Sequence, residues 1–386
     1  MNRLVVPLLL ASSLLAGCSF IPGLRDDDDN AEPPAKLENI SSEVKLRKLW
    51  STSAGVGYDE QFVKLVPTVE GPYLLVADRK GRVTALSAET GKRLWQTQTK
   101  KLLSAGPGAG EELVLVGTSD AEVLALSLLD GSIVWEAKVT SEVLSVPQID
   151  LGVVVVQTAN GNVTGLSAVD GSQLWIYDRT VPPLTLRGTS TPAVEHGVVL
   201  AGFASGKLTA ISIEKGFVAW ETSVAIPKGR SELERMVDVD ADPVIVGTAV
   251  YVASYQGRVV VIDIKNGDLG WTRDMSSFAG LGVDFAQVYV TDQESNVWAL
   301  TRDSGDSVWK QDKLFNRTVT APEPFSNYVA VGDYEGYLHL LSRYDGHFVA
   351  RVRVDSDGIS ARPVSADDVI YVYGNGGTVA AYTLEK

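Results

Sequence analysis

Short runs of apolar residues, each ended by turn residues, recur along the chain from about residue 64 to its end. Residues 73–76 and 153–156 are examples in which four consecutive positions have high β propensity. Pairs such as Asn160-Gly161 and Asp170-Gly171 favour hairpin turns, whose central residues need positive φ. The pattern predicts short antiparallel strands, and the one helical candidate is 231–236, inside a long loop.

These strands belong to a unit that occurs eight times. The template is segment 81–95, which begins at Gly81, has a turn glycine at Gly91 and ends in Trp95. A proline precedes the first position by 14 residues in seven units, and Leu281 takes its place in the sixth. The tryptophans at the last position are Trp50, Trp95, Trp135, Trp175, Trp220, Trp271 and Trp309. Such even spacing favours a structural role between neighbouring units over a ligand platform.

A unit of about 40 residues with several short strands is typical of a β-propeller blade. We therefore predict an all-β fold, an eight-bladed β-propeller with four-stranded blades that spans 44–386. The eighth unit begins at Pro363, but the chain ends before its tryptophan position. Residues 44–50 end like a unit that nothing precedes. We expect this N-terminal segment to be the outer strand of the last blade, which would close the ring and remove exposed edges.

The N-terminus predicts a secreted and anchored protein. Residues 1–17 resemble a lipoprotein signal peptide, with an apolar run too short to span a bilayer and small residues before Cys18. The resemblance to the bacterial lipobox implies that Cys18 carries the acyl chains, palmitate among them. Ser19, in place of an inner-membrane retention aspartate, implies the periplasmic face of the outer membrane. Residues 18–43, with four consecutive aspartates at 26–29, predict a flexible acidic tether.

Composition then removes several classes of function. A net charge of −14 argues against binding nucleic acid through its phosphates. One cysteine excludes an intrachain disulfide and a cysteine-rich zinc site. His196, His339 and His347 lack a neighbouring cluster of ligands, so we predict no metal site. With no nucleophile elbow and no phosphate loop, we expect neither an enzyme nor a cofactor.

Two long connections between units, 176–191 and 221–242, flank the same blade and should lie side by side. Apolar residues beside an arginine and aspartates fit a protein-docking patch, which combines anchors with a charged rim. Loops that fold their leucines onto their own blade would explain the pattern equally well. The aspartates do not continue into a calcium-binding loop. The candidate residues are Leu184, Leu186, Arg187, Asp238 and Asp240.

With its lipobox and eight units, the chain resembles the BamB family of outer-membrane assembly lipoproteins. Its most specific stretches are 184–188, 238–240 and 332–350. The resemblance implies a non-enzymatic scaffold of the β-barrel assembly complex, which docks on the POTRA domains of BamA through Leu184, Leu186, Arg187, Asp238 and Asp240. It implies a role in the folding and insertion of outer-membrane proteins, whose unfolded chains are further candidate partners.

Two alternatives belong to other classes. Quinone-dependent alcohol dehydrogenases have a similar repeat and tryptophan spacing, but those enzymes need a calcium-bound quinone and usually a vicinal disulfide. The single cysteine of this chain is already assigned to the anchor, which disfavours an enzyme. A structural spacer lipoprotein is the other alternative, and no motif distinguishes it from a docking protein.

Overall fold

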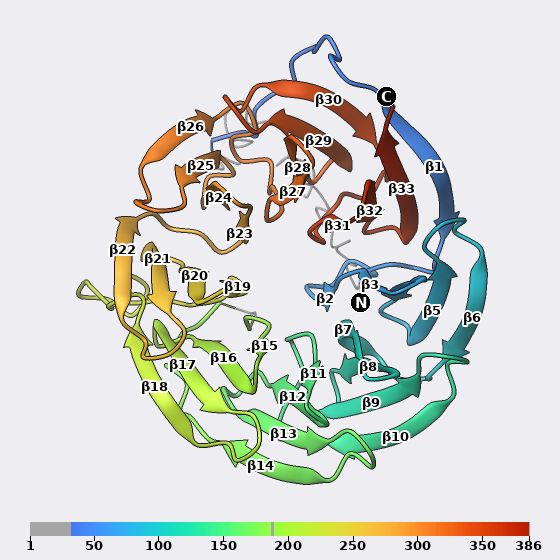
Figure 1. The fold of residues 1–386 in the computed structure, drawn as a ribbon, viewed down its shortest axis with the longest axis vertical. Helices are drawn as coiled ribbons and strands as arrows, with labels where there is room; N and C mark the ends of the chain where they lie inside the picture. Colours follow the sequence, from blue (N-terminus) through green and yellow to red (C-terminus); the bar gives the residue numbers. More distant parts are fainter. Residues whose placement is uncertain (1–31, 187–188, 386) are drawn as a thin grey trace, which may run out of the picture. The chain divides into compact units, whose positions relative to one another are not determined.

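The computed structural model describes residues 32–186 and 189–385, and the propeller lies within the compact unit that begins at Pro34. These residues form eight sheets arranged as blades around a central axis (Figure 1). The predicted eight-bladed β-propeller with four-stranded blades is therefore confirmed. Segment 231–236 forms turns rather than a helix. None of the described residues builds a helix with the length and hydrophobicity that a membrane span requires.

Blades 1 to 4 follow the chain, and in each of them the chain runs from the innermost strand to the outermost. Blade 1 contains β3 (Thr68–Glu70), β4 (Tyr73–Ala77), β5 (Arg82–Ser87) and β6 (Arg93–Gln98). Blade 2 contains β7 (Leu103–Gly110), β8 (Leu113–Thr118), β9 (Glu122–Ser127) and β10 (Ile133–Lys138). Blade 3 contains β11 (Gln148–Asp150), β12 (Val153–Gln157), β13 (Val163–Ser167) and β14 (Gln173–Tyr177). Blade 4 contains β15 (Ala193–Glu195), β16 (Val198–Phe203), β17 (Lys207–Ser212) and β18 (Val218–Ser223).

Blades 5 to 8 complete the ring. Blade 5 contains β19 (Val244–Val246), β20 (Ala249–Ala253), β21 (Arg258–Asp263) and β22 (Leu269–Asp274). Blade 6 contains β23 (Gly280–Val283), β24 (Gln287–Thr291), β25 (Val297–Thr301) and β26 (Ser307–Gln311). Blade 7 contains β27 (Glu323–Phe325), β28 (Tyr328–Gly332), β29 (Tyr337–Ser342) and β30 (Phe348–Arg353). Blade 8 contains β31 (Val364–Ala366), β32 (Val369–Tyr373), β33 (Thr378–Leu384) and, outermost, β1 (Leu46–Ser53).

The N-terminal strand closes the ring, as the sequence predicts. Strand β1 pairs antiparallel with β33, and Trp50 lies opposite Ala381. The strand begins two residues later than expected and continues to Ser53. One further strand, β2 (Lys64–Leu65), pairs in parallel with β7 on the axis side of blade 2. The sequence did not predict this fifth strand, because two residues carry no periodic pattern.

The seven tryptophans at the ends of the units join each blade to the next. Trp175 of blade 3 donates its indole N–H to the carbonyl oxygen of Ile213 in blade 4, at 2.6 Å. Its ring covers Gly216, where an added Cβ would lie only 2.7 Å from the indole. The donor and acceptor pairs are Trp50 and Ala88, Trp95 and Leu128, Trp135 and Ala168, Trp175 and Ile213, Trp220 and Ile264, Trp271 and Arg302, and Trp309 and Arg343. The tryptophans are therefore structural.

The junction between blades 7 and 8 is built differently. Blade 7 has Ala350 at the tryptophan position. At this junction the N–H groups of Glu43 and Val44 donate to the carbonyl oxygen of Val349, at 2.9 and 3.4 Å. Residues 34–43, which the sequence assigned to the tether, thus belong to the propeller unit and reach this junction.

We expect Gly216→Ala to destabilise the protein more than Gly247→Ala. Both glycines have positive φ, 70° and 64°, so alanine is strained at either site, by roughly 1–2 kcal/mol. Only Gly216 lies under a tryptophan, whereas the space around Gly247 is open. Overpacking against Trp175 should add about 1–3 kcal/mol. Free energies of unfolding from urea denaturation would measure the difference, and equal losses would contradict the tryptophan–glycine contact as a source of stability.

Candidate functional site

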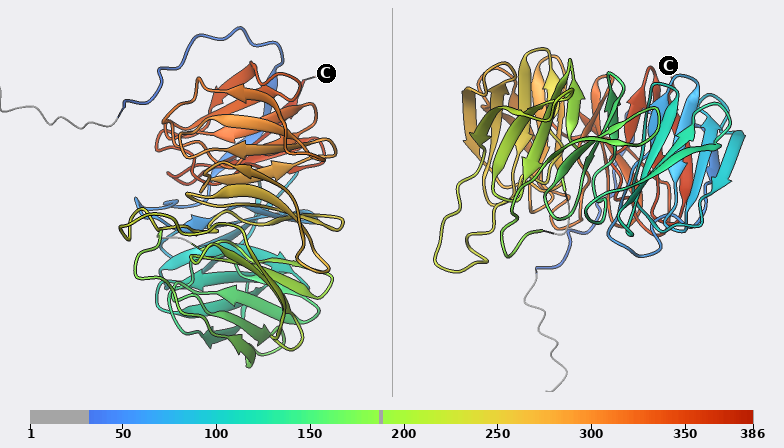
Figure 2. Two further views of the ribbon diagram at one scale, coloured as in Figure 1. Left: turned by 90° about the vertical axis from the view of Figure 1, so that its left-hand side faces the viewer. Right: turned by 90° about the horizontal axis from the view of Figure 1, so that it is seen from below.

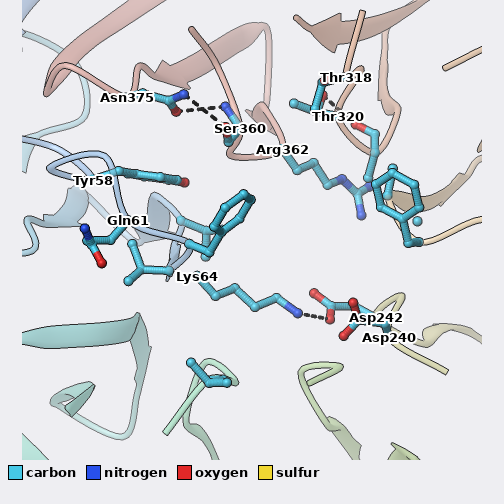
Figure 3. Close-up of a pocket in the computed structure, with 18 of the residues that line it drawn as sticks. Tyr58, Gln61, Lys64, Asp240, Asp242, Thr318, Thr320, Ser360, Arg362 and Asn375 are labelled. Carbon is cyan, nitrogen blue, oxygen red and sulfur yellow. Dashed lines mark hydrogen bonds and ion pairs between the residues drawn. The ribbon is translucent and has the colours of Figure 1, made fainter. Parts of the chain in front are cut away.

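The connections between blades lie on one face of the propeller, which we call the crossing face. In the right-hand view of Figure 2 the long connections project from the lower side of the ring. A cavity of about 920 Å³ opens among them, around the central axis. Figure 3 shows the polar side chains that line it, which include Tyr58, Gln61, Lys64, Asp240 and Arg362.

An ion pair ties the two candidate loops to this cavity. The Nζ of Lys64, on β2, lies 2.5 Å from Oδ1 of Asp242. The same ammonium group donates to the carbonyl oxygen of Thr189 at 3.1 Å, and the N–H of Thr191 donates to Asp242 at 2.6 Å. Lys64 therefore holds together the ends of connections 176–191 and 221–242, which meet beside the cavity.

Asp238 lies inside the protein and not on its surface, since only 3% of it is exposed. Its carboxyl group accepts the backbone N–H of Leu186, and its own backbone bonds to Tyr255. Oδ2 has no hydrogen-bond partner among the described residues. Burial, with the nearby charge of Asp240 adding to it, raises the pKa of Asp238 to about 8. Asp238 thus fixes the backbone of connection 176–191 at Leu186.

The other candidate residues differ in how accessible they are. Asp240 is half-buried and lines the cavity. Burial raises its pKa, while Lys64 opposes the shift and Asp242 adds to it. Leu184 is 41% exposed, whereas Leu186 is half-buried. Arg187 lies outside the described residues, as does Cys18.

Sequence reasoning missed an aromatic side of the cavity. Phe62 is 85% exposed and Phe278 is 42% exposed, and both line the opening. Phe62 belongs to the connection from β1 to blade 1, which is anchored where Tyr58 donates its hydroxyl to the carbonyl oxygen of Leu65 at 2.7 Å. The length of this connection was the available signal, because it is one of the three longest between units.

The three histidines lie away from the cavity lining. His339 is fully buried in blade 7 and bonds to Asp333, His347 bonds to Asp345 and Glu43, and His196 pairs with Glu195 at the surface. No cluster of histidine, cysteine, aspartate and glutamate suited to a metal occurs among the described residues. The chemistry that the site offers is recognition by apolar anchors and paired charges.

Known proteins place the chain among assembly factors. A family model described as outer membrane protein assembly factor BamB matches residues 47–101 and 79–311. A relative of that name from Pseudomonas aeruginosa is 49% identical, over 97% of this chain and 98% of its own. The crystal structure of BamB from Moraxella catarrhalis superposes with a TM-score of 0.79 at 24% identity, covering 88% of this chain and all of that one.

Quinone enzymes share the architecture only. A quinohemoprotein alcohol dehydrogenase from Pseudomonas putida superposes with a TM-score of 0.71 at 13% identity, over 90% of this chain and 78% of that one. At such identity the likeness extends to the fold alone. By contrast, the assembly-factor model matches more than half of the chain, and the relative from Pseudomonas aeruginosa is 49% identical over 97% of it. The chain therefore belongs to the BamB family of outer membrane protein assembly factors.

Proposed function

We propose that the protein is a non-enzymatic scaffold of the outer-membrane β-barrel assembly complex, which docks through its crossing face on the POTRA domains of BamA. Membership of the BamB family is the observation that carries this proposal. By holding BamA, the scaffold would assist the folding and insertion of outer-membrane proteins. The crossing face also offers exposed apolar side chains beside charged groups, which protein docking requires.

The crossing face combines exposed apolar side chains with charged groups. Phe62 and Phe278 are accessible at the cavity, Lys64 and Asp240 line it, and Leu184 is exposed on connection 176–191. Protein interfaces draw most of their binding energy from a few such apolar anchors surrounded by a polar rim. We infer that Leu184 and Phe62 contact the partner directly.

The candidate residues divide into two roles under this proposal. Asp238 is buried and acts through the backbone of Leu186, so it positions the loop and does not itself meet the partner. Asp240 lines the cavity and is available to a cationic group of the partner. We assign Arg187 to the direct contact, since it follows Leu186 in the same loop.

We also propose that Cys18 anchors the protein by its acyl chains to the periplasmic side of the outer membrane. The sequence motif supports this, with small residues before the only cysteine of the chain. Each buried CH₂ of an acyl chain contributes about 0.8 kcal/mol, so several chains would retain the protein at the bilayer.

We expect Leu184→Ala/Leu186→Ala to weaken binding to purified BamA POTRA domains at least tenfold, because apolar anchors are lost. Phe62→Ala should also weaken it. Surface plasmon resonance with the protein lacking residues 1–18 would measure the affinity. The matched control is Leu129→Ala, since Leu129 is 78% exposed in the β9–β10 hairpin, at the opposite end of the strands. Equal affinity of all variants would contradict docking through this face.

The stability of Asp238→Asn should depend on pH differently from that of the natural protein. Asp238 is protonated in the folded state up to about pH 8 but ionises near pH 4 in the unfolded chain. Folding therefore takes up a proton, and the free energy of unfolding falls as the pH rises from about 4 to about 8. Asparagine does not titrate, so the variant should gain on the natural protein by at least about 1 kcal/mol over this range.

Denaturation at pH 5 and pH 8 measures this difference. Asp120→Asn, at an exposed turn position, is the control and should follow the natural protein at both values. A constant difference between Asp238→Asn and the natural protein would show that Asp238 stays ionised.

Cys18→Ser should remove the protein from the outer-membrane fraction. The variant retains the signal peptide but offers no thiol for acylation. We expect the variant to be missing from the outer-membrane fraction, with which the natural protein sediments. Persistence of Cys18→Ser in washed outer membranes of cells that lack BamA would contradict the lipid anchor.

A further inference from the structure

Residues 34–44 run along blade 7 before the chain enters β1. The N–H of Ala35 donates to the carbonyl oxygen of Phe315 at 2.9 Å, and at the other end Glu43 and Val44 bond to Val349. Leu37 packs against a buried cluster that includes Trp309 and Leu341. We call residues 34–44 the strap. Figure 1 shows its blue trace beside β30 before it enters β1.

A charged network lies buried beneath the strap. Arg317 donates from Nε to Oδ2 of Asp333 at 2.9 Å, and its side chain is 3% exposed. Asp333 and His339 are fully buried, with Nε2 of His339 3.0 Å from the same carboxylate oxygen. Arg351 donates from Nε to Nδ1 of His339 at 3.0 Å. Since Nδ1 accepts, the imidazole is neutral and donates from Nε2 to Asp333, and burial lowers its pKa accordingly.

Both arginines end in donors that point at the strap. Nη1 of Arg317 donates to the carbonyl oxygen of Ala35 at 2.9 Å, and Nη1 of Arg351 donates to that of Glu38 at 2.8 Å. The outer contacts are ionic, since Lys313 lies 2.6 Å from Glu38 and His347 lies 3.1 Å from Glu43.

Burying so many charges costs free energy unless each one is paired. In this molecule the network reaches from the core of blade 7 to two carbonyl groups of the strap, and so it fixes the strap's backbone. Stretch 332–350, which is distinctive in the sequence, supplies Asp333, His339 and the backbone of Val349.

We propose that the Arg317–Asp333–His339–Arg351 network is a clamp for the chain's own N-terminal strap. The clamp fixes the point at which the N-terminal part of the chain leaves the propeller. That point is Ala35, beside Phe315 and Arg317 in the connection between blades 6 and 7. This connection lies on the crossing face, where its residues Thr318 and Thr320 line the cavity.

The clamp sets how far the crossing face can lie from an N-terminal anchor. Cys18 precedes Pro34 by sixteen residues, which span at most roughly 55 Å when fully extended. A strap detached as far as Val44 would add about 35 Å to this limit. A clamped strap therefore shortens the largest distance that the chain allows between the crossing face and the point of attachment.

Hydrogen exchange and limited trypsin digestion of the full mature chain test the proposal. In the natural protein we expect protected amides at Ala35, Glu43 and Val44, and slow cleavage after Lys36. Arg351→Leu should speed exchange of these amides, and cleavage after Lys36, at least tenfold while β4, β8 and β12 keep their protection. The matched control is Arg353→Leu on the same strand, whose guanidinium contacts Glu335 and Tyr337 and should leave the strap protected.

A second variant leaves the buried charges intact. Arg351→Lys keeps the positive charge in blade 7, but one short ammonium group cannot reach both Nδ1 of His339 and the carbonyl oxygen of Glu38, so exchange and cleavage near residue 36 should rise without change in the blade. This variant decides the matter if Arg351→Leu unfolds the blade. Free exchange of the strap amides in the natural protein would overturn the clamp, as would equal protection in Arg351→Leu and Arg353→Leu, or an unchanged strap in Arg351→Lys.

Discussion

The contact between a tryptophan of one blade and a glycine of the next is the constraint on which the propeller depends. The indole must lie flat on the turn, because its N–H has to reach a carbonyl oxygen of the neighbouring blade, as Trp175 reaches Ile213. A side chain at the glycine would displace the ring, and positive φ at the same residue already disfavours any other amino acid. Glycine at the turn thus satisfies both the positive φ and the close contact with the indole.

Seven such contacts leave one junction to be made in another way. Blade 7 carries Ala350 at the tryptophan position, and the last unit ends before its own fourth strand. The N-terminal part of the chain supplies what both lack, since Glu43 and Val44 bond to Val349 and β1 completes blade 8. The strap and β1 therefore act together: the strap makes the junction at blade 7, and β1 supplies the missing fourth strand of blade 8.

The connections between blades escape this constraint, because neither the tryptophan nor the glycine lies in them. They vary in length, and the long ones meet around the axis on the crossing face. Lys64 joins two of them by its bonds to Asp242 and Thr189. The hydrogen bond from the N–H of Leu186 to Asp238 joins the same two connections. A rigid ring that presents variable loops on one face suits a docking scaffold, since binding residues can be placed without disturbing the blades.

The sequence by itself determined the architecture. The number of blades, their four strands and the closure by β1 all followed from a unit whose glycine and tryptophan positions recur, because a repeated local pattern must build a repeated local structure.

The sequence also indicated where the loops meet, though not what each residue does there. Asp238 was predicted as a contact residue, yet it is buried, and Phe62 and Lys64 were missed. Burial and pairing in these loops depend on segments more than a hundred residues apart, as in the bond from Lys64 to Asp242. The clamp around His339 likewise joins residue 35 to residue 317, and only the tertiary structure could bring those atoms together.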